Sequence, residues 1–65
     1  MSNLKTMRQA VGMSQNQLAK QSNINVRMIQ HYEQGTKDIN KAQAITVYKL
    51  AVALNTSVEK LLELN

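Results

Sequence analysis

The sequence contains no cysteine and no proline, and its only aromatic residues are two tyrosines. Without cysteine, the chain has neither a disulfide nor a thiolate that could bind zinc. The absence of proline removes the strongest helix breaker, which favours compact helices joined by short turns. Because aromatic side chains are so few, aliphatic residues and methionine must fill the core. No apolar run approaches the roughly 20 residues needed to span a bilayer.

Acidic residues are also scarce. The chain has eight Lys and Arg against four Asp and Glu, which gives a net charge of +4. All of the surplus lies in residues 1–41, where six basic and two acidic residues occur, and the later charges cancel. Such a concentrated positive charge is typical of a protein that binds a polyanion, although a charge that serves only solubility would give the same count.

The N-terminus lacks the charged region and apolar core of a secretory signal, so the sequence predicts a cytoplasmic protein with no membrane association. At 65 residues, the chain is near the size at which a single apolar core is just sufficient. We therefore expect one domain, residues 1–65. Hydrophobic residues make up 43% of the chain, which favours a packed fold over disorder.

Apolar residues recur at helical spacing along five short stretches, which predicts a compact, five-helix, all-α fold. Gly12 and Gly35 follow the first and third stretches as C-terminal stops. Ser14, with Gln17 three residues later, has the form of a capping box, and Asn25 can cap the third helix. The residues expected to face the core are Leu4, Met7, Val11, Leu18, Ala19, Ile24, Ile29, Tyr32, Val47, Leu50, Ala51, Leu54, Val58, Leu61 and Leu62.

The second and third helices are predicted to be short and close together. Ser22-Asn23 interrupts the pattern between them, and Asn tolerates the left-handed conformation of a tight turn. Two short helices joined in this way have helix-turn-helix geometry. Residues 36–41 (TKDINK) are expected to form a polar connecting loop. A fourth helix is predicted over roughly residues 42–54, with Asn55 as a left-handed residue after it and Ser57 as the cap of a fifth.

The third helix, in the stretch NVRMIQHYEQG, carries polar side chains on the face opposite its core positions. With Ile29 and Tyr32 turned inward, a second set of residues projects outward. This set contains Val26, Arg27, Gln30 and His31. Arg27 can bind guanine O6 and N7, Gln30 can pair with adenine, and Val26 can touch a thymine methyl. The set is therefore a candidate for reading DNA bases.

An ordinary exposed histidine is the alternative explanation for His31. A metal site would need several ligands, and the chain has neither a cysteine nor a second histidine, so no metal or other cofactor is expected. Catalysis would need a nucleophile and an acid or base in a pocket, and a small helical domain offers little concavity. We therefore expect no enzymatic activity.

Three segments, in this order and spacing, resemble the small helix-turn-helix domains of the phage lambda repressor and Cro type, called the XRE family. The segments are LKTMRQAVGMSQNQLA, NVRMIQHYEQG and YKLAVALNTSVEKLLEL, and the resemblance runs from Leu4 to Leu62. It implies a sequence-specific transcriptional regulator, a repressor, whose third helix reads the major groove of double-stranded DNA. It also implies a homodimer on a pseudo-palindromic operator.

Gln15 and Asn16 stand at the start of the second helix, where free N–H groups and the helix dipole favour a phosphate. The resemblance places Gln15, pointing outward, against the DNA backbone. Further phosphate candidates in the loop are Lys37, Asn40 and Lys41. For Arg8 and Glu33, the resemblance implies a partly buried structural ion pair, the alternative being two independent surface charges.

Val52 does not fit the inward face of the fourth helix. Together with Leu61, Leu62 and Leu64, it is a candidate for a homodimer contact through the C-terminal region. The alternative function is that of an antitoxin or adaptor whose main role is to bind a protein partner. What separates the two functions is whether the outward face of the third helix contacts DNA.

Overall fold

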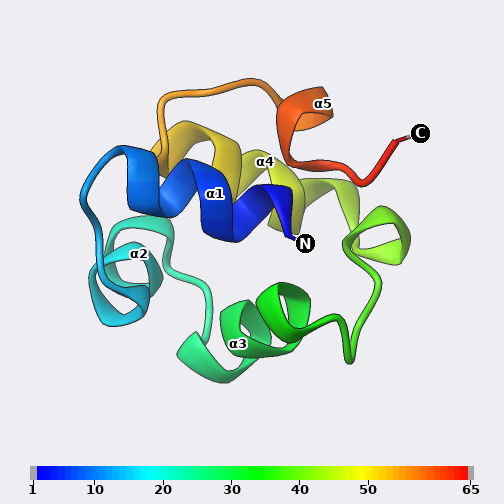
Figure 1. Ribbon diagram of the computed structural model, residues 1–65, viewed down its shortest axis with the longest axis horizontal. Helices are drawn as coiled ribbons and strands as arrows, with labels where there is room; N and C mark the ends of the chain where they lie inside the picture. Colours follow the sequence, from blue (N-terminus) through cyan, green and yellow to red (C-terminus); the bar gives the residue numbers. More distant parts are fainter. Residues whose placement is uncertain (1, 65) are drawn as a thin grey trace.

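The computed structural model describes residues 2–64, which form five α-helices, one short 3-10 helix and no strand. The elements are α1 (Asn3–Ala10), α2 (Gln15–Ser22), α3 (Val26–Gln34), the 3-10 helix η1 (Ile39–Lys41), α4 (Ala44–Ala53) and α5 (Val58–Leu61). In Figure 1, α1 crosses in front of α4, while α3 and α5 lie on opposite sides of the molecule. The predicted compact, five-helix, all-α fold is confirmed.

The core is aliphatic apart from one tyrosine, as the composition requires. Its buried members are Leu4, Leu18, Ile29, Tyr32, Ile39, Val47, Leu50, Ala51, Leu54 and Leu61. All five α-helices and η1 contribute at least one of them. Partly buried hydrophobic residues pack around this core, among them Met7, Ala19, Ile24, Val58 and Leu62. Fully burying one such aliphatic side chain contributes about 1.5–3 kcal/mol, so this cluster supplies the main driving force for folding.

Local signals in the sequence place the helix ends around the turn between α2 and α3. The Ser14 hydroxyl accepts the Gln17 N–H at 3.0 Å, and the Gln17 side chain accepts the Ser14 N–H at 2.7 Å, which completes the capping box. The Asn25 side chain accepts a backbone N–H of the first turn of α3 at 2.8 Å. Asn23 and Gly35 take left-handed φ values of 59° and 82° and end α2 and α3. The expected helix-turn-helix is therefore present.

The structure corrects the sequence prediction at three places. Residues 36–41 do not form a simple loop, because Asp38 caps η1 and Ile39 is buried in the core. Val11 lies beyond the end of α1, at the turn into Gly12, and is exposed rather than buried. Ser57 precedes α5 as predicted, but its side chain makes no capping hydrogen bond.

The C-terminal segment is fixed against the start of α1 and against η1. The Asn40 side chain donates to the Glu63 carbonyl oxygen at 3.0 Å and accepts the Glu63 N–H at 2.7 Å. The Glu63 carboxylate accepts the Asn3 N–H at 3.0 Å, and the Asn3 side chain donates to the Leu62 carbonyl oxygen at 2.8 Å. These four hydrogen bonds connect both ends of the described chain to the segment that follows α3.

Candidate nucleic-acid interface

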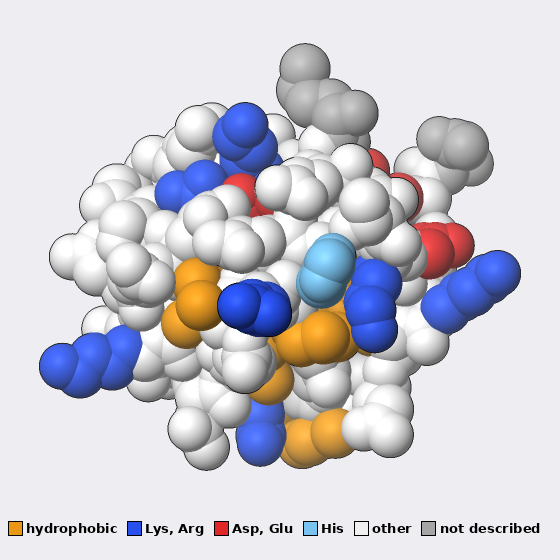
Figure 2. Space-filling model, turned by 90° about the horizontal axis from the view of Figure 1, so that it is seen from below, with side chains coloured by type: hydrophobic (Ala, Val, Ile, Leu, Met, Phe, Trp, Pro, Cys, Tyr) orange, Lys and Arg blue, Asp and Glu red, His pale blue; other side chains and the backbone are white. Residues whose placement is uncertain are grey.

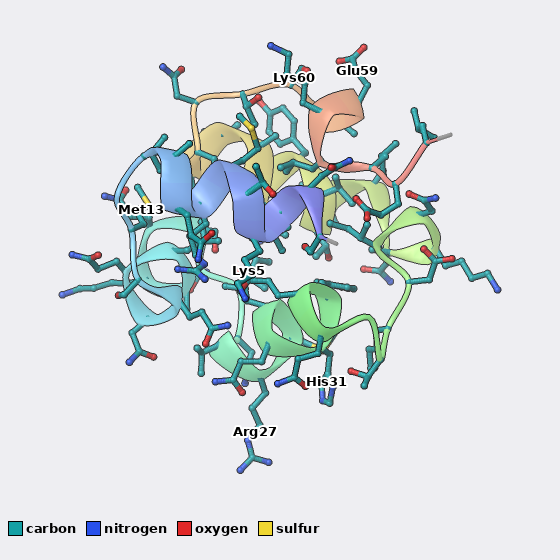
Figure 3. The ribbon with its side chains drawn as sticks, in the orientation of Figure 1. Lys5, Met13, Arg27, His31, Glu59 and Lys60 are labelled. Carbon is teal, nitrogen blue, oxygen red and sulfur yellow. The ribbon has the colours of Figure 1, made fainter. Side chains whose placement is uncertain are left out.

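The third helix packs through one face and exposes the other. Ile29 and Tyr32 are buried in the core, so the opposite face of α3 meets solvent. Arg27, in the first turn, is exposed. The other members of the predicted row are half-buried: Val26, Gln30 and His31. Figure 3 shows Arg27 and His31 directed away from the body of the molecule on the outer side of α3.

The face of the molecule that carries α3 is rich in positive charge. Figure 2 shows this side, where Lys and Arg side chains are spread around the histidine. Arg8 and Glu33 form the ion pair found within residues 2–64, so the Arg27 guanidinium has no carboxylate partner among these residues. A free guanidinium presents its planar fork of N–H donors, which matches guanine edges and phosphate oxygens.

Arg8 and Glu33 form the ion pair that the resemblance implies. Arg8 Nε and Nη2 donate to the two Glu33 carboxylate oxygens at 2.7 and 3.0 Å, and Nη1 donates to the Met13 carbonyl oxygen at 2.8 Å. Hydrogen bonding to Glu33 raises the pKa of the Arg8 guanidinium, against the opposing effect of burial and with help from the carboxylate charge. The pair therefore fastens the end of α3 to α1.

The side chain of Gln15 does not point freely outward as predicted. It is half-buried, and its Nε2 donates to Glu33 at 3.0 Å. Gln30 Nε2 lies 3.5 Å from Gln15 Oε1, at the long limit for a hydrogen bond. Gln15 turns toward Glu33 because the Glu33 carboxylate, which can only accept hydrogen bonds, still has a free lone pair beside Arg8. Asn16, in the first turn of α2, is exposed.

The three loop candidates differ in how free their side chains are. Lys37 and Lys41 are exposed, and their ammonium groups have no hydrogen-bond partner within residues 2–64. The Asn40 side chain is instead held by Glu63 through two hydrogen bonds, so it fixes the loop rather than reaching outward. Sequence reasoning missed Thr36, whose hydroxyl lies 2.8 Å from a ring nitrogen of His31.

A row of exposed apolar residues follows one face of α4. Its members, spaced by three and four residues, are Ile45, Tyr48 and Val52. Each is more than half exposed, at 54, 58 and 59%. Of the C-terminal residues predicted to contact a partner, Leu61 is fully buried, so the prediction is wrong for that residue. Leu62 is half-buried and packs against the core. Leu64 is exposed.

Within residues 2–64, no three His, Cys, Asp or Glu side chains lie together as ligands for a metal ion. Over the same residues, no helix has both the length and the apolar character needed to cross a membrane.

The model of the helix-turn-helix family HTH_3, which is of the XRE type, matches residues 4–61. The chain belongs to this family. The matched region contains α1 to α5 apart from Asn3, and it includes all of the candidate site residues. HTH_3 membership makes α2 and α3 the helix-turn-helix of a DNA-binding transcription regulator.

A solved structure supports the HTH_3 assignment. The high-resolution crystal structure of the restriction-modification controller protein C.AhdI from Aeromonas hydrophila resembles this chain with a TM-score of 0.80 and 29% sequence identity. The similarity covers 91% of this chain and 85% of that one. A comparison with curated proteins gives no significant match.

Proposed function

We propose that the protein is a sequence-specific regulator of transcription, acting as a repressor, that reads the major groove of double-stranded DNA with α3. The observation that carries this proposal is the outward row on α3 (Val26, Arg27, Gln30 and His31), in which the Arg27 guanidinium is free of any carboxylate within residues 2–64. The N-terminal residues of a recognition helix contact the base edges. Arg27 is the second residue of α3 and is therefore well placed to reach a guanine.

The other residues of the outward row on α3 differ in the bases that they suit. The Gln30 amide suits adenine and the Val26 methyl groups suit the thymine methyl. Gln30 lies further along α3, and its amide is close to Gln15, so its approach to a base is more restricted. His31 lies one residue beyond Gln30 on the same face. We propose that these residues set base preference, with Arg27 supplying the strongest single contact.

Phosphate contacts come from the flanking segments. Asn16 and the second N–H of the Gln15 side-chain amide stand at the N-terminus of α2, where the helix dipole favours an anion. Lys37 and Lys41 extend from the segment after α3, and Asn40 holds that segment in place. These contacts are the same on every sequence, so they supply affinity and register but no base preference.

The homodimer is proposed to form through the exposed row on α4. Ile45, Tyr48 and Val52 make a continuous apolar stripe that is unfavourable in water and that a second copy would cover. A dimer with two-fold symmetry would present one α3 helix to each half-site of a pseudo-palindrome, whose half-sites lie one turn of DNA, about 34 Å, apart. Such a dimer on an operator would block other proteins from the same DNA, which is why we propose repression.

Fluorescence anisotropy with a duplex selected from a random library, compared with a scrambled duplex, tests the proposal. We expect the selected site to bind at least about a thousandfold more tightly. Both affinities should fall between about 50 and 200 mM salt, because phosphate contacts release counterions. Equal affinity for the two duplexes would refute sequence-specific reading. No binding to either would favour an antitoxin or adaptor that uses the α4 row to hold a protein partner.

A further inference from the structure

The Glu33 carboxylate, near the end of α3, is bonded to side chains of both α1 and α2. It accepts Arg8 Nε and Nη2 at 2.7 and 3.0 Å, and it accepts Gln15 Nε2 at 3.0 Å. The Glu33 side chain is only 2% exposed, so little water competes for these bonds. A residue expected to serve the ion pair with Arg8 thus also holds one of the candidate phosphate-binding side chains.

The chemistry of this contact fixes the direction of the Gln15 amide. A carboxylate paired with a guanidinium is ionised and can only accept hydrogen bonds, whereas an amide donates through its nitrogen and accepts through its oxygen. The nitrogen must therefore face Glu33, because the reverse placement would bring the amide oxygen against a negative charge. Gln15 Oε1 accordingly lies toward Gln30, 3.5 Å from its Nε2.

This arrangement decides what Gln15 can offer to DNA. One N–H of its amide binds Glu33, and the other has no partner within residues 2–64. A phosphate oxygen can accept that second N–H. A side chain that is already held in one orientation loses less conformational freedom on binding than an unrestrained glutamine, so its contact with DNA is stronger.

We propose that Glu33 is a positioning residue for DNA binding that acts through Gln15. Its carboxylate holds the Gln15 amide in one orientation, with an N–H left for a phosphate oxygen of the DNA backbone. This inference rests on the proposed binding of DNA. Phosphates are present on every duplex, so Glu33 in this role affects the affinity for all sequences and leaves base preference unchanged. Glu33 itself contacts no DNA.

The hold on the amide can be measured without DNA, so this test is independent of the proposed function. In ¹H–¹⁵N spectra of the free wild-type protein, the exchange of the Gln15 side-chain N–H protons with water is compared with that of the exposed Asn16 side chain. We expect one Gln15 proton to exchange at least about tenfold more slowly, the worth of one hydrogen bond to a charged group. Equal exchange rates for the two side chains overturn the proposal.

The second test is a double-mutant cycle with a random duplex. Its background is Arg8→Met with Glu33→Leu, which removes the carboxylate without leaving an unpaired charge. Gln15→Ala should weaken binding about tenfold in the wild type and less than about threefold in this background. Asn16→Ala is the matched control, because Asn16 is the neighbouring amide and shares no hydrogen bond with Glu33 within residues 2–64. It should cost the same in both.

A merely structural role of Glu33 would shift α2 as a whole and change the costs of Gln15→Ala and Asn16→Ala together. That result overturns the proposal, as does a cost of Gln15→Ala that is equal in the wild type and the background. If circular dichroism shows that the background is unfolded, the exchange measurement on the wild type decides alone. Failure of the wild type to bind any duplex overturns the proposed function, whereas the exchange rates still report whether Glu33 holds Gln15.

Discussion

Replacing Glu33 by alanine tests whether the ion pair with Arg8 holds the reading helix in place. The Glu33 carboxylate accepts three hydrogen bonds, two from Arg8 at 2.7 and 3.0 Å and one from Gln15 at 3.0 Å. Glu33→Ala removes all three. The Arg8 side chain, only 11% exposed, would keep its bond to the Met13 carbonyl oxygen and lose its counter-charge.

The size of the effect follows from this burial. Removing one partner of a buried ion pair costs about 3–5 kcal/mol. Because the Arg8 side chain keeps some contact with water, we expect the lower end, about 3 kcal/mol. Domains have about 0.05–0.15 kcal/mol of stability per residue, so this is a large part of the total. At roughly 4–8 °C per kcal/mol, the melting temperature should fall by about 12–24 °C.

Thermal unfolding followed by circular dichroism measures this change. Glu59→Ala is the matched control, because it removes the same charge from an exposed residue of α5, on the opposite side of the molecule from α3 (Figure 3). It should shift stability by less than about 0.5 kcal/mol. Replacing both partners, Arg8→Met with Glu33→Leu, should recover part of the loss, because no unpaired charge remains. Equal melting temperatures for Glu33→Ala and Glu59→Ala would refute the structural role of the pair.

Asn40→Ala removes both side-chain hydrogen bonds to Glu63 and should lower the free energy of unfolding, measured with a chemical denaturant, by about 1–2 kcal/mol. Asn16→Ala at an exposed position is the control, and an equal loss in the two variants would contradict this role of Asn40. Val52→Glu places a charge in the apolar row of α4 and should leave a folded monomer in sedimentation at concentrations where the wild type is a dimer. A dimer that persists in this variant rules out the proposed contact. Lys37→Ala should weaken selected and random duplexes alike and reduce the salt slope by about one unit, whereas a loss confined to the selected site would make Lys37 a base reader.

The helix ends could be predicted because they depend on residues close together in the chain. The capping box at Ser14 needs a partner only three residues away. Asn23, Asn55 and Gly35 take left-handed conformations because of their own backbone preferences. The outward row of α3 could be predicted for a similar reason, because the helical period of 3.6 residues assigns the two faces of a helix once its buried residues are known.

Pairings between distant residues leave no such local signal. Gln15 and Glu33 are 18 residues apart, and Asn40 and Glu63 are 23 apart. From their positions in the sequence, the side-chain amides of Gln15 and Asn40 are predicted to face phosphate. The fold instead brings each amide to a glutamate that the residues around it in the sequence do not indicate. Ile39 is a single apolar residue in a polar segment, so it produces no periodicity, and η1 with its buried side chain is missed.

Whether α3 reads base pairs is decided by selecting bound sequences from a random duplex library with the wild type, Arg27→Ala and Lys60→Ala. Lys60 lies far from Arg27 in Figure 3 and controls for the loss of one positive charge. We expect the wild type and Lys60→Ala to select the same inverted repeat, with half-site centres about 10 base pairs apart. Arg27→Ala should bind that site about 1–3 kcal/mol more weakly and lose the preference at one base pair of each half-site. An unaltered motif from Arg27→Ala, with all duplexes weakened equally, would contradict base reading by Arg27 and make it a phosphate contact.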